Sequence, residues 1–112
     1  MNRTDWLQAL LHFDRPVSEI TSSLAHFGWD SDEKLVTLKR EHFVSILKRY
    51  LDDEISSEEV TAWANAIECR EDIGFDEEHE DLVRETLHEL ANPYLTRPLS
   101  REIASELIER LS

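Results

Sequence analysis

Apolar residues recur along most of this chain at three- and four-residue intervals, the spacing of one side of an α-helix. Near the N-terminus this pattern predicts two short helices. Thr4 can cap the first. Asp14 can cap the second, which accepts Pro16 in its first turn and ends at Gly28. Their apolar stripes are Trp6, Leu7, Leu10, Leu11 and Val17, Ile20, Leu24, Phe27. The pattern leaves open whether Trp6 and Trp29 are buried.

Two further helices are predicted in the middle of the chain, one over residues 39–52 and one from Ser56 onward. Ser56 and Glu59 have the spacing of a capping box, in which each side chain accepts a hydrogen bond from the backbone of the other residue. The fourth helix has the most regular apolar stripe, so we expect it at the centre of the fold. Its inward residues are Val60, Trp63, Ala64 and Ile67, and a flank of small residues comprises Ala62, Ala66 and Cys69.

Two segments lack the helical pattern. "KLVTL", residues 34–38, has the character of a strand, but no partner strand is evident, and we interpret it as an extended linker. In "ECREDIGFD", residues 68–76, Ile73 and Phe75 alternate with polar residues, as two apolar contacts that tie a loop to the core would. Neither segment adds a sheet to the predicted fold.

The C-terminal third predicts two more helices. Asp76 can cap a helix over residues 77–91, the turn residues Asn92 and Pro93 end it, and Ser100 can cap the last helix. The sequence therefore predicts an all-α fold, a single domain over residues 1–112 built as an irregular bundle of five or six short helices.

Composition supports this fold class. The chain has 112 residues, 40% of them hydrophobic, which suffices for one core, and only 2 glycines and 3 prolines to interrupt helices. Cys69 is the only cysteine, so an internal disulfide is excluded. No segment resembles a signal peptide or approaches the ~20 apolar residues of a membrane span. We expect a soluble, cytoplasmic protein without membrane contact.

The charge of the chain is concentrated in its middle. The net charge is -13, and residues 52–81 hold 13 acidic residues against one basic residue, Arg70. Such a field repels nucleic acid and anionic lipid and attracts a basic protein, while the alternative explanation of the net charge as a whole is that it keeps the protein soluble. Acidic residues in the first turn of a helix are stabilised by its dipole, which explains Glu58, Glu59, Glu77 and Glu78 without a partner. It does not explain the further acids Glu71, Asp72, Glu80 and Asp81.

Catalytic and metal sites find little support in the sequence. The acidic run lacks the order of a calcium-binding loop because Ile73 and Phe75 stand where ligands should be. Glu85 and His88 form a single E-x-x-H pair, whereas a di-metal bundle needs two. Cys69 has acidic neighbours, which oppose thiolate formation. We expect no enzyme activity, metal or cofactor.

The run "LKRYLDDEISSEEVTAWANAIECREDIGFD", with "ELANP" after it, resembles a pattern in small uncharacterised bacterial proteins. In being small, acidic, helical and single-domain, the chain also resembles bacterial immunity proteins, which neutralise a cognate toxin. That resemblance implies an inhibitor that covers the basic surface of a nuclease toxin and mimics its nucleic acid with carboxylates. It assigns no role to any particular residue.

Together these observations predict a small acidic protein-binding module whose partner is a basic protein such as a toxin domain. A housekeeping or regulatory helical protein without an inhibitor role, which includes a homodimer, is the alternative. A metal-dependent function of the same carboxylates is a third hypothesis. The predicted partner-binding residues are Glu68, Glu71, Asp72, Ile73, Phe75, Asp76, Glu77, Glu78, Glu80 and Asp81.

Overall fold

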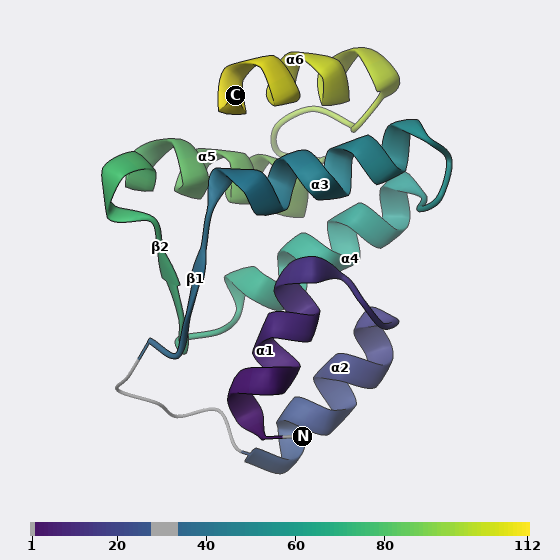
Figure 1. Ribbon diagram of the computed structural model, residues 1–112. Coiled ribbons are helices and arrows are strands. Elements are labelled where there is room, and N and C mark those ends of the chain that lie inside the picture. The colour runs from purple at the N-terminus through teal and green to yellow at the C-terminus, as the bar shows by residue number, and fades with distance from the viewer. Residues whose placement is uncertain (1, 28–33) are drawn as a thin grey trace.

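The computed structural model describes residues 2–27 and 34–112 (Figure 1). Its helices and strands, in chain order, are α1 (Arg3–His12), α2 (Val17–Leu24), η1 (Ala25–Phe27), β1 (Val36–Leu38), α3 (Arg40–Leu51), α4 (Ser57–Glu68), β2 (Ile73–Phe75), η2 (Glu77–His79), α5 (Glu80–Ala91) and α6 (Arg101–Leu111), where η marks a short 3-10 helix. The all-α fold class is confirmed, with two short strands in addition.

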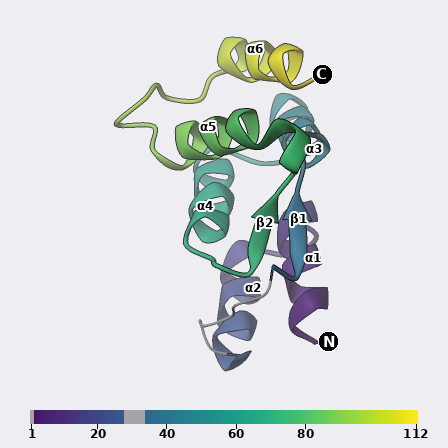
Figure 2. The same cartoon turned by 90° about the vertical axis from the view of Figure 1, so that its left-hand side faces the viewer.

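Helix α4 lies at the centre of the fold, as its sequence predicted. It contacts α1, α2, α3 and α5, while α6 packs on α3 (Figure 1). Figure 2 shows the same layers from the side, with α6 at one end and α1 and α2 at the other. All four residues of the predicted inward stripe of α4 are at most 1% exposed. The Trp63 indole N–H donates to the Leu10 carbonyl oxygen at 2.6 Å, and the ring meets Phe43 edge-on.

The two strands correct the interpretation of residues 34–38 as a linker. β1 pairs in parallel with β2, with Val36 opposite Ile73 and Leu38 opposite Phe75. The partner was missed because α3 and α4 separate the two strands in the sequence, and no local pattern reports a pairing over that distance. Glycine suits the middle of β2, since a Cβ atom at Gly74 would lie 3.3 Å from the Lys34 Cβ atom. The pair joins the start of α3 to the start of η2.

Two of the predicted helix caps are confirmed. The Ser56 hydroxyl accepts from the Glu59 N–H, and the Glu59 carboxylate accepts from the Ser56 N–H, both at 3.1 Å. The Ser100 hydroxyl accepts from the Ile103 N–H at 3.2 Å and caps α6. Because capping depends only on residues three positions apart, it is readable from the sequence.

The caps of α1 and α2 were predicted wrongly. Asn2 caps α1 by accepting from the Asp5 N–H at 2.8 Å, so the cap lies two residues before Thr4. α2 follows Pro16 directly and has no side-chain cap from Asp14 or any other residue. Asparagine is as good a cap as threonine, and its earlier position lets α1 begin at Arg3. The expected end of the second helix at Gly28 and the placement of Trp29 lie outside the described residues.

The predicted fifth helix begins in two steps. Asp76 caps η2 by accepting from the Glu78 N–H at 3.3 Å, and the regular helix α5 starts only at Glu80. Trp6, whose placement the sequence left open, is half-buried against the core and has the Arg15 guanidinium 5.4 Å from its ring centre. Within the described residues, no helix combines the length and apolar character needed to cross a membrane.

Candidate functional site

The acidic middle segment of the sequence does not form one surface. Helix α4 has twelve residues and is therefore about 18 Å long, and acidic residues gather at or beyond each of its two ends. One group, here called the acidic turn, lies at the connection from α3 to α4 and comprises Asp52, Asp53, Glu54, Glu58 and Glu59. The other lies around β2, η2 and the start of α5, at the opposite side of the molecule (Figure 1).

The second group surrounds a depression of about 570 Å³, here called the acidic hollow. Five predicted partner-binding residues lie in its wall, namely Phe75, Asp76, Glu77, Glu78 and Glu80. Strand β2 supplies the apolar ring of Phe75, and the four carboxylates come from Asp76, from η2 and from the first residue of α5. The remaining lining residues are Lys34, Thr37, Gly74 and Arg84. The fold thus brings five of the predicted residues together, one of them an aromatic ring and the other four carboxylates.

The two cations of the acidic hollow are both engaged by groups of the protein. The Arg84 guanidinium pairs with Glu80 at 2.8 Å and lies 4.7 Å from the centre of the Phe75 ring. The Lys34 ammonium donates to the Glu71 carbonyl oxygen. Glu77 and Glu78 are exposed in the first turn after Asp76, where backbone N–H groups favour negative charge. The hollow therefore presents negative charge to the solvent.

Asp72 does not belong to this exposed surface. Its side chain is 0% exposed and accepts from Arg70 Nε and Nη2 and from Arg3 Nε, each at 2.8 Å. Burial acts to raise the pKa of Asp72, but the hydrogen bonds and positive charge of Arg70 and Arg3 hold that pKa below its usual range. Asp72 therefore joins α1 to the segment between α4 and β2, which corrects its place among the predicted partner-binding residues.

The other four predicted residues lie outside the hollow. Ile73 is 2% exposed and packs in the core, so its side chain cannot meet a partner. Glu68, Glu71 and Asp81 are exposed but do not line the hollow. The Glu68 carboxylate lies 3.8 Å from the His88 ring, and this is an ion pair only when the histidine is protonated. A partner that covers more than the hollow would reach these three carboxylates.

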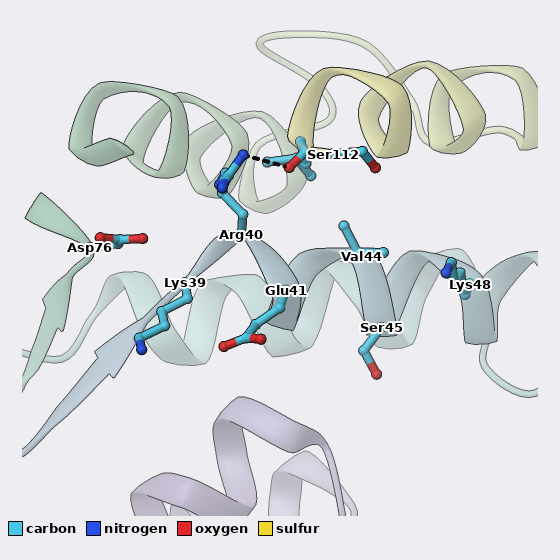
Figure 3. Close-up of a pocket in the computed structure, with 9 residues that line it drawn as sticks. Lys39, Arg40, Glu41, Val44, Ser45, Lys48, Asp76 and Ser112 are labelled. Atoms are coloured by element: carbon cyan, nitrogen blue, oxygen red, sulfur yellow. Dashed lines mark hydrogen bonds between the residues drawn. The ribbon is translucent and has the colours of Figure 1, made fainter. Parts of the chain in front are cut away.

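A groove of about 620 Å³ along α3 was not predicted (Figure 3). It is lined by Lys39, Arg40, Glu41, Val44, Ser45, Lys48, Asp76, Leu111 and Ser112. In Figure 3, Arg40 reaches towards the end of α6, where its guanidinium donates to the Leu111 carbonyl oxygen at 3.2 Å. The four-residue spacing of Arg40, Val44 and Lys48 signals one face of α3, but the sequence gives no sign that α6 closes the groove. Mixed charges give this groove no clear preference for one ligand class.

A buried histidine, His42, lies in the first turn of α3, close to Arg40 of the groove. His42 Nδ1 accepts from the Lys39 N–H at 2.9 Å, and the His42 ring meets the His12 ring edge-on with centres 5.1 Å apart. Burial lowers the pKa of His42, and the neighbouring His12 lowers it further. A neutral His42 fits this place, because its acceptor nitrogen satisfies a backbone N–H at the helix start.

The described residues do not gather three or more histidine, cysteine, aspartate or glutamate side chains in a position to hold a metal ion. Cys69 is exposed at the end of α4. No protein-family model, curated protein or solved structure matches the chain. The resemblance to immunity proteins therefore stays a prediction, and a function can be inferred only from the protein's surface.

Proposed function

We propose that this protein is a binding module that docks a basic protein partner on the acidic hollow. The observation that carries the proposal is the grouping of Asp76, Glu77, Glu78 and Glu80 around the exposed part of Phe75. Carboxylates around an apolar surface suit a lysine or arginine side chain, whose methylene groups pack on the ring while the charged end meets the acids.

Charge and shape contribute differently to such binding. The net charge of -13 accelerates the approach of a basic partner and makes association sensitive to salt. The aromatic ring supplies contact area at the centre of the interface. The protein's own Arg84 makes a contact of this kind, with its guanidinium 4.7 Å from the Phe75 ring centre and paired with Glu80, and a partner's arginine would replace or extend it. A nuclease toxin, the partner class implied by the resemblance, presents the basic surface that this geometry suits.

The test is a triple charge reversal confined to the hollow, Glu77→Lys with Glu78→Lys and Glu80→Lys. Asp72 is left unchanged, because its reversal would break the interior ion cluster. The matched control reverses three exposed glutamates on other faces, Glu85→Lys, Glu102→Lys and Glu109→Lys, and so has the same net charge.

Partners are captured from the source cell with each variant, and the dissociation constant of each purified complex is measured at several salt concentrations. We expect a basic partner whose affinity falls about 100-fold or more with the hollow variant, with a smaller and salt-screened loss for the control. Equal losses for the two variants would show that only net charge matters and would refute the site. If the partner is a nuclease, inhibition of its activity by the wild-type protein tests the toxin-neutralising role directly.

A further inference from the structure

A second surface lies on the loop of residues 92–99, here called the Tyr94 loop, between α5 and α6. Tyr94 is 101% exposed and Leu95 is 77% exposed, so the packing of the core does not depend on either side chain. Phe27, at 42%, is the other exposed large hydrophobic residue in the described part of the chain. Two adjacent large apolar side chains presented to water to this extent are unusual in a fold whose other described large hydrophobic residues are all more deeply buried.

The Tyr94 loop is held firmly in place. The N–H groups of Leu95 and Thr96 both donate to the Asn92 carbonyl oxygen at 3.0 Å. The Thr96 hydroxyl makes bonds of 3.0 and 2.9 Å to the carbonyl oxygens of Glu89 and Asn92. The Arg97 guanidinium donates to the Glu89 carboxylate at 2.7 Å. Because these bonds fix the loop before binding, a partner pays little conformational entropy to order it.

A depression of about 310 Å³, here called the apolar hollow, separates the Tyr94 loop from the first turns of α4. Pro93, Tyr94, Pro98 and Leu99 form the wall on the side of the loop. Ser57, Glu58 and Thr61 form the wall on the side of α4. One wall therefore offers apolar contact, and the other offers hydroxyl groups and a carboxylate.

The charge beside the apolar hollow is negative. Glu58 belongs to both the hollow and the acidic turn defined above. An ion pair links the acidic turn to the chain just after the Tyr94 loop. The Asp53 carboxylate lies 3.6 Å from the guanidinium of Arg101, which follows Leu99 by two residues. The segment from Asp52 to Glu59 contains five acidic residues and no basic residue, but Glu54 pairs with Arg49 at 3.1 Å and Asp53 with Arg101, so the excess negative charge comes mainly from Asp52, Glu58 and Glu59. A ligand of this surface thus meets an apolar centre with carboxylates at one side.

We propose that the Tyr94 loop and the apolar hollow bind a segment of a partner protein that presents a large apolar side chain next to lysine or arginine. Tyr94 and Leu95 supply the apolar contacts, and Glu58 with the acidic turn receives the basic side chains. A second copy of this chain is a poorer occupant, because a two-fold interface would bring two copies of Glu58 and the acidic turn against each other. This surface lies apart from the acidic hollow and is independent of it.

A random library of 12-residue peptides displayed on phage tests the proposal. The library is selected on the wild-type protein and depleted on the Tyr94→Ala, Leu95→Ala double variant. Both side chains are exposed, so the double variant should keep the melting temperature of the wild type, and circular dichroism checks this. We expect enriched peptides to carry a large apolar residue with at least two lysines or arginines close by.

The enriched peptide is then synthesised, and its dissociation constant is measured by calorimetry. We expect a loss of affinity of about ten-fold or more with the Tyr94/Leu95 variant, and several-fold with Glu58→Lys. The matched control Phe27→Ala, which removes another exposed aromatic ring, should leave affinity unchanged. The triple reversal of the acidic hollow should cause only the small loss that its lower net charge produces, and high salt should abolish that loss, so this proposal and the proposed function can fail separately.

Four results would overturn the inference. The first is the absence of any enriched peptide, and the second is enrichment of acidic peptides. The third is equal affinity of the enriched peptide for the wild-type protein and the Tyr94/Leu95 variant. The fourth is a dimer in sedimentation equilibrium that the Tyr94/Leu95 substitutions abolish, because the occupant would then be a second copy of the chain.

Discussion

Asp72 and Glu77 belong to one acidic run of the sequence, yet the structure gives them opposite environments. The Asp72 carboxylate is enclosed and bound by Arg70 and Arg3, whereas Glu77 stands in solvent at the rim of the acidic hollow. A buried carboxylate with two arginines specifies how segments of the fold meet, and an exposed one specifies what the surface attracts. The formal charge is the same for both, so charge counting alone cannot separate the two roles.

The largest expected effect comes from removing the buried carboxylate. Asp72→Ala should lower the free energy of unfolding by about 3–5 kcal/mol, because Arg70, whose side chain is 4% exposed, loses its enclosed carboxylate partner. Urea denaturation followed by circular dichroism measures the change. Glu77→Ala is the matched control and should stay within about 0.5 kcal/mol of the wild type. Similar losses for both substitutions would remove the distinction between the two environments.

An intermediate effect is expected from the second buried titratable group, His42. Its pKa in the folded protein is lowered, so the unfolded chain binds the proton more strongly. Above a pH of about 6.5, His42 is neutral in both the folded and the unfolded protein and does not affect the free energy of unfolding. As the pH drops below that value, the unfolded chain takes up the proton first, so the free energy of unfolding falls. His42→Gln keeps an acceptor for the Lys39 N–H but cannot titrate, so this part of the pH dependence should vanish.

Unfolding by urea between pH 8 and pH 5 measures this prediction. Asp72 affects the pH dependence only at lower pH. Because its pKa is lowered in the folded protein, the stabilisation by its carboxylate is lost only as the pH falls below the usual pKa range of an aspartate. A His42→Gln variant with the same pH dependence as the wild type down to pH 5 would show that His42 protonation does not oppose folding.

The smallest effect is expected in the acidic hollow itself. Glu77→Gln with Glu78→Gln removes two charges from the start of η2 and α5, where the helix dipole favours them and neighbouring carboxylates oppose them. These two contributions act in opposite directions, so the free energy of unfolding should change by less than about 1 kcal/mol. Thermal unfolding at low and high salt measures this. A large loss would mean that the hollow, like Asp72, has a structural role.

The parts of the molecule that the sequence predicted are those specified by neighbours along the chain. The capping box of Ser56 and Glu59 and the inward stripe that contains Trp63 each depend on residues within a few turns of one helix. The acidic hollow was partly predictable for the same reason, since Phe75 and Glu80 lie within one short segment. The role of Arg84 there depends on where α5 places it relative to β2.

The features that escaped prediction depend on residues far apart in the chain. The bond from Arg3 to Asp72 spans 69 positions, and no local pattern distinguishes that aspartate from its exposed neighbours. The pairing of β1 with β2 and the closure of the groove by α6 have the same character. Helical periodicity reports which face is apolar, and it does not report which element covers that face.

The pairing of β1 with β2 has a consequence for the order of folding during synthesis. Residues of β1 leave the ribosome before α3 and α4, but their partner strand follows only after both helices have been made. Until then Val36 and Leu38 have no strand to pair with, and Arg3 waits for Asp72. The helices up to α4 can pack on one another before then, whereas the parallel pairing of β1 with β2 and the bond from Arg3 to Asp72 form only after residues 72–75 have emerged, as late and comparatively slow steps of folding.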